Sequence, residues 1–490
     1  MRFDPNNRHR GKAKKTRSKP QHMAKAIECQ VVDQSHDGRG VAKFQGETVF
    51  IAGAINGERV KTTGLVKKKS WWETQVQAIL EPSPHRVEPF CPHFQQCGGC
   101  SLQHVDLPKQ LENKQQVLIS QLSRLAGVTE QQWQGIQLLP AMASPGQHYR
   151  SRARFGVTEG QLSFRQKASK QGWPIDQCPV LSQGLNAWIP IINEHLLPVL
   201  KGWQLSELEI SEDGQGQVSL VIHRETKAPL TKAKEIDAIQ QSLALSQPLE
   251  RISIFLRQRE GSLVPLKSTK SVQTYGLEIP SKPPSRETQP LLPLTFRLAP
   301  GQFSQVNQVV NQAMVVQALN LLDLGPEDRV IDLFAGGGNF TLPIASQCQQ
   351  VLALEGSDEL VTLGQQNAHN NGLSNVEFRQ ADLFQLDDTV KAALGAYDVV
   401  LLDPPRAGAK ELCTELAKLC SSRARLCRAS QVGKVLYVSC NPATLARDAE
   451  ALMAGGYQMT HVGVMDMFPH TDHVESMALF VHPRAKRQEK

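Results

Sequence analysis

The spacing of apolar and polar positions divides the chain into three regions, of which residues 26–84 are the first. Short apolar runs alternate there with turns rich in Gly, Asp and Asn, and this pattern predicts short strands. The runs are Ile27–Val32, Val41–Phe44, Thr48–Ile51, Arg59–Leu65 and Trp71–Leu80. So many short strands in one small region predict a β-barrel.

The second region, residues 85–295, mixes helix and strand patterns. Apolar residues at helical spacing predict a helix over Leu111–Leu125. Val218–His223 and Ile252–Leu256 have the composition of strands, and the proline-rich segment Ser281–Pro293 marks the end of the region. We therefore expect a central α+β domain.

The third region, residues 296–490, repeats the order strand, then helix. One helical face over Val306–Leu321 ends at Gly325–Pro326, just before the first strand. The apolar strands are Val330–Phe334, Val351–Leu354, Val376–Phe378, Val399–Leu402 and Val435–Val438. This alternation is typical of an α/β, Rossmann-like domain with a doubly wound parallel sheet, which binds ligands at the carboxyl ends of its strands.

The composition excludes several classes of protein. Of the 490 residues, 40% are hydrophobic and 21% are charged, as in globular proteins. No apolar run approaches the roughly 18–20 residues that cross a bilayer, and no apolar stretch follows the basic N-terminus as in a secretory signal. We therefore expect no membrane association and a cytoplasmic location. In such a reducing compartment the ten cysteines are more often metal ligands or catalytic groups than disulfides.

The net charge of +7 is concentrated at one end of the chain. Residues 1–25 contain nine basic residues and one acidic residue, so the remainder is nearly neutral. We expect a disordered tail, which suits a polyanion such as RNA through counterion release, although a solvated leader without function fits equally well. Arg150, Arg152 and Arg154 alternate along a predicted strand, and we expect that face to contact RNA phosphates.

Acidic residues or glycines follow four strands of the third region. The first strand leads into the glycine-rich turn Asp332–Asn339, the second ends at Glu355, the third leads to Asp382 and the fourth ends at Asp403. Because a G-x-G-x-x-G motif and a P-loop are both missing, a ligand with a ribose but without phosphate fits best. This set resembles class I S-adenosylmethionine (SAM) methyltransferases. The resemblance implies that Glu355 holds the ribose and that Asp382 lies near the adenine.

A further strand ends in Ser439-Cys440-Asn441-Pro442, beside the expected methyl donor. A lone cysteine is usually a small buried hydrophobe, but this position suits chemistry. The C5 atom of uracil is a poor nucleophile until a thiolate adds to C6 and creates an enolate. After C5 has taken a methyl group, a base must remove its proton. Glu475, within His473-Val474-Glu475-Ser476, is the candidate base.

Together with Gln302-Phe303-Ser304-Gln305-Val306-Asn307, these motifs resemble the RNA uracil-C5 methyltransferase family. The resemblance implies that Cys440 is the nucleophile, that Glu475 is the base, and that the target base leaves its stack to reach them. It also implies a SAM site lined by Gln305, Phe334 and Asn339, with Asp403 between cofactor and base.

Four cysteines form a second constellation. Cys91, Cys97 and Cys100 have the spacing C-x5-C-x2-C, and Cys178 supplies a distant fourth thiol. Thiolates suit zinc or an iron–sulfur cluster, and the spacing leaves the choice open. The ribosomal-RNA members of the family carry this spacing with a [4Fe-4S] cluster. The resemblance therefore implies such a cluster in the central domain.

The resemblance also narrows the substrate. The OB-like barrel over 26–84 looks like a TRAM domain, and the barrel and the cluster together resemble family members that methylate 23S ribosomal RNA at site 1939. Members acting on tRNA uracil-54 lack the cysteines, and those acting on site 747 lack the barrel. We expect a monomeric enzyme that forms 5-methyluridine. Two other classes stay open: an amino-group methyltransferase, suggested by Asp403-Pro404-Pro405, and a non-catalytic RNA-binding protein.

Overall fold

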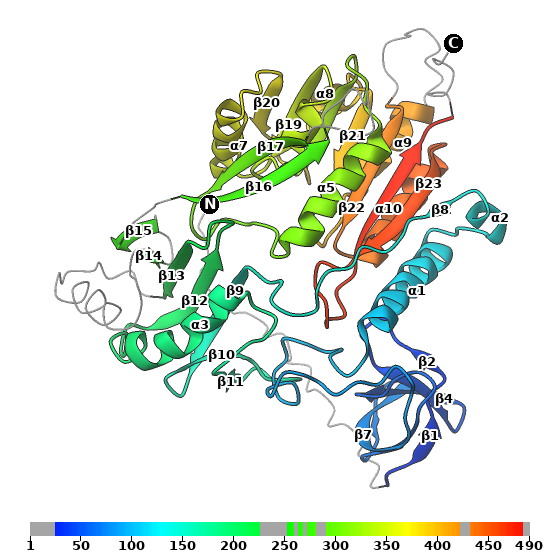
Figure 1. Cartoon of the computed structure of the whole chain (residues 1–490). Helices are drawn as coiled ribbons and strands as arrows, with labels where there is room; N and C mark the ends of the chain where they lie inside the picture. The colour runs from blue at the N-terminus through cyan, green and yellow to red at the C-terminus, as the bar shows by residue number, and fades with distance from the viewer. Residues whose placement is uncertain are drawn as a thin grey trace, which may run out of the picture. The chain divides into compact units, whose positions relative to one another are not determined.

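The computed structural model describes residues 25–225, 252–258, 263–267, 272–280, 291–421 and 432–483 (Figure 1). The chain divides into two compact units, with the boundary between Arg86 and Val87 in the sequence. The predicted basic tail lies outside the described residues, apart from Lys25. Within the described ranges, no helix is both long enough and apolar enough to cross a membrane.

The first unit is one sheet of short strands. Its strands are β1 (Glu28–Gln30), β2 (Asp33–Gln34), β3 (Gly40–Phe44), β4 (Glu47–Ala52), β5 (Arg59–Thr62), β6 (Val66–Lys67) and β7 (Trp71–Glu81). The strand order is β1-β5-β7-β4-β3-β2, and β6 pairs with β7. All pairs are antiparallel except β4 with β7.

This sheet curls around an apolar core. Its two end strands, β1 and β2, are consecutive in the chain. Between them, the N–H of Val31 donates to the carbonyl of Glu58, and the N–H of Val32 donates to the carbonyl of Val41, both at 2.8 Å. The two ends of the sheet therefore meet at one segment, a form compatible with the predicted barrel. The core includes Val31, Ala42, Val49, Ile51, Val60, Leu65 and Trp72.

The second unit begins with a smaller sheet. Its strands are β9 (Arg152–Thr158), β10 (Gln161–Arg165), β11 (Gly172–Pro174), β12 (Leu205–Glu212), β13 (Val218–Arg224), β14 (Ile252–Gln258) and β15 (Leu263–Lys267), in the order β11-β10-β9-β12-β13-β14-β15. The helix α3 (Gln183–Ile191) and the π-helical turn η1 (Ile192–Leu196) pack on it through Leu185, Trp188 and Leu196. The predicted strands Val218–His223 and Ile252–Leu256 are confirmed.

The structure contradicts the expected RNA contact for Arg152, one of the three arginines predicted to face the RNA. The guanidinium of Arg152 is mostly buried, pairs with Glu209 at 2.6 Å and donates to the carbonyls of Gly301 and Gln302. Arg154 also pairs with Glu209, at 2.7 Å, although half of its side chain is exposed. The prediction is wrong for Arg152, because a buried carboxylate and two loop carbonyls use its donors.

The largest sheet has eight strands, in the order β20-β19-β18-β21-β22-β24-β23-β8. They are β18 (Arg329–Leu333), β19 (Gln350–Glu355), β20 (Val376–Gln380), β21 (Val399–Leu402), β22 (Lys434–Ser439), β23 (Gln458–Met465), β24 (Glu475–Val481) and β8 (Gln137–Leu138). The five strands from β20 to β22 run parallel, and β24 is antiparallel to both neighbours. The predicted doubly wound α/β sheet is confirmed.

Helices cover both faces of this sheet (Figure 1). One face packs on α5 (Gln308–Leu322), α6 (Thr341–Ala345) and α7 (Asp358–Asn370). The other packs on α1 (Leu107–Leu125), α8 (Asp388–Leu394), α9 (Lys410–Ser421) and α10 (Pro442–Ala454), while the short α2 (Glu130–Trp133) precedes β8. Two apolar cores therefore enclose the strands whose ends carry the predicted site.

Two segments of the predicted central region pack with the third region. Helix α1 places Leu118 and Leu122 in the core beneath α10, and β8 extends the large sheet beside β23. The hairpin of β16 (Gln273–Pro280) and β17 (Leu291–Leu298) packs against α5 and α7. The domain around the large sheet is thus assembled from segments on both sides of residue 296.

Candidate active site

A cavity of about 1190 Å³ lies at the carboxyl ends of the parallel strands. All eight residues that the sequence predicted for the cofactor and the reaction line this one cavity: Gln305, Phe334, Asn339, Glu355, Asp382, Asp403, Cys440 and Glu475. Residues up to 170 positions apart in the sequence therefore meet at one edge of the sheet.

The register of the strands explains this convergence. Leu333 pairs with Leu354 on one side and with Leu402 on the other, so the next residues of the three strands, including Glu355 and Asp403, emerge together. Glu355 pairs in turn with Gln380, two residues before Asp382. Because the strands are parallel, all these ends face the same side of the fold.

The glycine-rich turn after β18 has an unusual backbone. Phe334, Gly336 and Gly338 all have positive φ angles, of 66°, 56° and 100°. Glycine adopts such angles freely, but a phenylalanine is strained there, and strain of this kind concentrates at functional sites. A side chain at Gly338 would place its Cβ 2.5 Å from Leu342, so the turn has no room for one. The turn brings its backbone close to the cavity.

Glu355, the residue predicted to bind the ribose, is held in place by two backbone N–H groups. The two carboxylate oxygens of Glu355 accept hydrogen bonds from the N–H groups of Gly336 and Ser357, both at 3.0 Å. Each carboxylate oxygen has further acceptor capacity, so the side chain can still accept from two hydroxyl groups. Glu355 thus links the glycine turn to the start of α7.

Asp382, which follows the neighbouring strand β20, lines the same cavity and has an exposed side chain. Its Oδ1 accepts from the N–H groups of Phe384 at 2.9 Å and Gln385 at 3.2 Å. The half-exposed ring of Phe384 lies 5.6 Å from that of Phe334. Two aromatic faces beside a carboxylate suit a planar heterocycle with N–H donors.

Asn339 belongs to a polar network that the sequence did not reveal. Its side-chain amide exchanges two hydrogen bonds with the amide of Asn311, at 2.9 and 3.1 Å, and its Oδ1 also accepts from the hydroxyl of Tyr275. Tyr275 lines the cavity from β16 and stacks on Phe296. Tyr275 is 64 residues from Asn339 in the sequence, and no motif marks it, because only tertiary packing brings it here.

Cys440 and Glu475 lie opposite each other. Ser439 pairs with Ser476 in the antiparallel β22–β24 ladder, so Cys440 and Glu475 are the next facing positions. Helix α10 starts directly after Cys440, because Asn441 caps it through the N–H of Ala443 and Pro442 fits its first turn. The thiol is therefore held between a strand end and a helix start.

The polar groups at this end of the cavity are poorly solvated. Burial, together with the charge of Asp403, raises the pKa of Glu475 to about 8. Burial also raises the pKa of Asp403 to about 7. The pKa of the Cys440 thiol is raised to about 11 by burial and by the charges of Glu475 and Asp403. The cavity thus holds a protonated thiol beside carboxyl groups that are stronger bases than usual.

Arg406 is the cation of this cluster. Its Nη2 donates to Nδ1 of His473 at 2.6 Å, and both side chains line the cavity. The Arg406 charge lowers the pKa values of Cys440 and Glu475 and so opposes the effect of burial. Burial and Arg406 also lower the pKa of His473, so its ring can accept the hydrogen bond as a neutral group.

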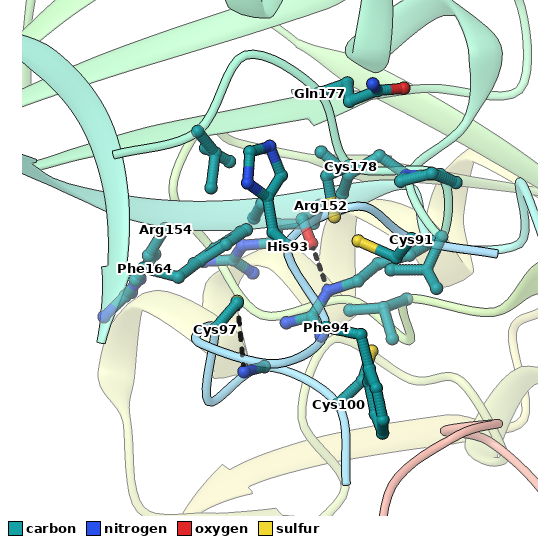
Figure 2. Close-up of a pocket in the computed structure, with 18 of the residues that line it drawn as sticks. Cys91, His93, Phe94, Cys97, Cys100, Arg152, Arg154, Phe164, Gln177 and Cys178 are labelled. Carbon is teal, nitrogen blue, oxygen red and sulfur yellow. Dashed lines mark hydrogen bonds between the residues drawn. The ribbon is translucent and has the colours of Figure 1, made fainter. Parts of the chain in front are cut away.

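The four predicted metal-ligating cysteines line a second cavity, of about 660 Å³ (Figure 2). Cys91, Cys97 and Cys100 come from one loop, and Cys178 comes from the segment after β11. The N–H of Gly99 donates to the sulfur of Cys97 at 3.3 Å. No group of three His, Cys, Asp or Glu side chains in the described part of the chain is arranged to hold a single metal ion.

The two cavities share a wall. Phe303 and Ser304 line both of them, and the side chain of Phe303 is 70% exposed. The ring of Phe303 is therefore not packed in a core of the fold.

Comparisons with known proteins agree with the geometry. Residues 107–482 match the family model described as tRNA (Uracil-5-)-methyltransferase. The chain belongs to this family. The matched range includes Cys178, Cys440 and Glu475 but begins after Cys100.

Relatives in this family cover nearly the whole chain. A protein of Hahella chejuensis named 23S rRNA (uracil(1939)-C(5))-methyltransferase RlmD is 37% identical, over 93% of this chain and 97% of its own length. A protein of Shewanella amazonensis with the same name is 39% identical, over 96% and 98%. The crystal structure of Pyrococcus abyssi tRNA (uracil-54, C5)-methyltransferase with S-adenosyl-L-homocysteine has 20% identity and a TM-score of 0.66 over 93% of this chain and all of that chain. At that identity it supports the shared fold.

Proposed function

We propose that the protein is a SAM-dependent methyltransferase that converts a uracil of 23S ribosomal RNA to 5-methyluracil, at the site named 1939 in its relatives. The observation that carries this proposal is the facing pair Cys440 and Glu475 at the end of a cavity whose other walls suit a nucleoside. A thiol and a base on opposite sides of one space are what methylation at C5 of uracil requires.

The cofactor part of the cavity lies along the first strands of the sheet. SAM supplies an electrophilic methyl group when it is bound. Glu355 would accept hydrogen bonds from the ribose, Asp382 and the rings of Phe334 and Phe384 would contact the adenine, and Gln305 and Asn339 would border the amino-acid part. Asp403 lies between this part and Cys440, since it follows β21, the strand between β18 and β22.

The reaction begins at Cys440. Its thiol loses a proton as sulfur bonds to C6 of the flipped uracil, and electrons move through the ring to the O4 side. Asp403, with a pKa raised to about 7, is a better acceptor for that proton than an ordinary carboxylate. The Arg406 charge stabilises the negative charge that develops, because it lies close enough to affect both Cys440 and Glu475.

Glu475 completes the reaction. Once C5 carries the methyl group, its remaining proton must leave before the C6–S bond can break. Glu475 takes this proton, the double bond re-forms between C5 and C6, and Cys440 leaves as a thiolate. With its pKa raised to about 8, Glu475 is well matched to this step near neutral pH.

We also propose that Cys91, Cys97, Cys100 and Cys178 hold a [4Fe-4S] cluster. Four thiols around one cavity, with an N–H of a Gly-Gly pair donating to one sulfur, support this choice. The ligands of a cluster bind different irons, so they lie farther apart than donors around a single ion. The cluster's role would be structural, shaping the surface next to Phe303.

The curled N-terminal sheet, in our proposal, is a TRAM domain that binds RNA, and the basic tail assists it. Trp71 is partly exposed at the start of β7 and follows Lys67, Lys68 and Lys69 in the sequence, whereas Trp72 packs in the core and Lys67 pairs with Glu47. Positive charge beside aromatic rings is typical of surfaces that bind single strands. We expect the enzyme to act as a monomer in the cytoplasm.

The test of the proposed function is methylation of purified RNA. Radiolabelled SAM, unmethylated 23S ribosomal RNA and the protein should give 5-methyluridine at one position, found by nuclease mapping. Labelling of transfer RNA or of another 23S site would assign the protein to a different substrate within the family. Label on an exocyclic amino group, or no transfer at all, would contradict uracil-C5 chemistry.

A further inference from the structure

The segment between β23 and β24 has to be held in place from outside. Asp466–Val474 has no strand or helix structure, yet it leads directly into Glu475. Phe468 and His473 within it line the catalytic cavity together with Glu475. Because small displacements of a reacting group are costly, the contacts that fix this segment affect the chemistry.

Within this segment, His470 is held by hydrogen bonds of both its backbone N–H and its carbonyl. Its φ angle is 65°, a left-handed conformation that strains any residue with a side chain. Its carbonyl accepts from the N–H groups of Ser101 and Leu102, both at 2.9 Å. Its own N–H donates to Oε1 of Gln110 at 2.8 Å, and its Nδ1 lies 3.1 Å from Nε2 of the same glutamine. These contacts hold a backbone that would otherwise relax.

Gln110 links His470 to the loop that carries Cys91, Cys97 and Cys100, here called the cysteine loop. Its side chain is fully buried in the first turns of α1. Besides its two contacts with His470, its Nε2 donates to the carbonyls of Leu102 at 3.0 Å and Val105 at 2.7 Å. Leu102 follows Cys100 by two residues, so one amide connects the end of the cysteine loop with the catalytic segment.

A second contact from the same helix face supports this arrangement. Lys114, four residues after Gln110, forms a buried ion pair with Asp466 at 2.7 Å and donates to the carbonyl of Phe468 at 3.0 Å. The hydroxyl of Tyr149 donates to the carbonyl of Pro469. Gln110 and Lys114 thus hold the segment at two points from one rigid helix.

We propose that Gln110 is a positioning residue for the proton-abstraction step. Through His470 it fixes the segment that ends in Glu475, and through Leu102 it ties that segment to the loop of Cys91, Cys97 and Cys100. The proposal rests on the proposed role of Glu475 as the base. It makes the cysteine loop a support of the catalytic centre, in addition to any role at the RNA surface.

The experiment compares Gln110→Met with Gln116→Met. Both changes remove an amide from α1, but Gln116 is exposed. The RNA substrate carries tritium at C5 of uracil, and SAM carries a labelled methyl group, so methyl transfer and proton release are measured separately. For Gln110→Met we expect kcat to fall about tenfold or more with KM values for RNA and SAM nearly unchanged. A methylated RNA–protein adduct that has not released tritium should accumulate, whereas Gln116→Met should behave like the wild type.

The outcomes separate this inference from the proposed function. If the wild type releases no tritium and forms no adduct, the proposed function fails. If the wild type reacts and, in a single turnover with enzyme in excess over RNA, Gln110→Met slows methyl transfer as much as tritium release, or slows neither, Gln110 does not position the base. Thermal melting and SAM binding of each variant measure any general loss of folding.

A second pair of variants tests the strained backbone if Gln110→Met does not fold. His470→Gly and His470→Ala both remove the imidazole, but only glycine adopts a φ of 65° without strain. The proposal predicts faster tritium release for His470→Gly than for His470→Ala. Equal rates would mean that the backbone at His470 does not set the position of Glu475.

Discussion

The two cavities that share Phe303 and Ser304 both contain cysteine thiols, but the groups around these thiols differ. In the catalytic cavity, burial and the charges of Glu475 and Asp403 raise the pKa of Cys440 to about 11, and Arg406 opposes them. In the cysteine cavity, burial raises the pKa of Cys100 to about 11 and of Cys178 to about 12, and neighbouring thiols add to the effect.

The difference lies in the charged neighbours. Burial raises the pKa values of Cys91, Cys97 and Cys100; Lys167 opposes the rise at Cys91 and Cys97 and Arg150 opposes it at Cys100, whereas Asp176 adds to it at Cys91. Burial is the largest cause of the raised pKa in both cavities, and each cavity holds at least one cation that opposes it. The cavities differ in that several thiols face one another in one, whereas a single thiol faces two carboxyl groups in the other. Burial alone therefore does not distinguish the two kinds of cysteine; the neighbouring groups do.

The largest expected effect follows from replacing the base. Glu475→Gln keeps the shape of the side chain but cannot take the C5 proton, so turnover should fall by about 10²–10⁴-fold. A methylated covalent RNA–protein adduct should accumulate on denaturing gels. Glu377→Gln, at an exposed position of β20, is the matched control. Release of product from Glu475→Gln at the normal rate would assign the base role to another residue.

The next effect concerns the cysteine cavity. Cys97→Ser should lose most of the iron and sulfide found in anaerobically purified protein, because a serine is a poor ligand for the cluster. Cys348→Ser is the control: burial also raises the pKa of Cys348, but this residue lines neither cavity. Stoichiometric zinc without iron in the wild type would reject the cluster.

A smaller effect is expected in the pH dependence of proton release. Glu475 must be ionised to act as a base, so the rate should rise with pH up to about 8 and then level off. Arg406→Gln removes the charge that lowers the pKa of Glu475, so the rise should move to higher pH. Release at pH 7 should fall severalfold and recover at high pH, whereas Arg379→Gln, an exposed site, should leave the profile unchanged. A profile of Arg406→Gln identical to the wild type would disprove this coupling.

The smallest effect should come from the tail. Deleting residues 1–25 removes nine basic residues, so RNA affinity at physiological salt should fall a few-fold and its dependence on salt should weaken. Methyl transfer at saturating RNA should stay the same. Filter binding across a salt series measures both quantities, and identical slopes for the two proteins would make the tail inert.

The sequence predicted the residues at strand ends because their positions follow from local patterns. Glu355, Asp403 and Cys440 each come directly after or at the end of an apolar strand, and parallel strands bring such ends together. The register that sets Glu475 opposite Cys440 joins Ser439 to Ser476, which are 37 residues apart; the sequence named both Cys440 and Glu475 for the reaction but did not predict this register.

What the sequence could not predict depends on contacts between distant segments. The bonds of Gln110 and Lys114 to the catalytic segment span 360 and 352 residues, and nothing local distinguishes these side chains on a predicted helix. The pattern of Arg152 was misleading for the same reason, because its partner Glu209 and the loop at Gly301 are remote in sequence. Polar side chains need their tertiary partners before a role can be assigned.

The most direct test of the account is covalent capture by 5-fluorouracil RNA. Fluorine at C5 blocks the final elimination, so the wild type with SAM should form an adduct that survives denaturation and carries the labelled methyl group. Cys440→Ala should form none, while Cys413→Ala, a buried thiol outside the cavity, should still form it. An adduct that persists in Cys440→Ala, or its absence in the wild type, would contradict the assignment of Cys440 as the nucleophile.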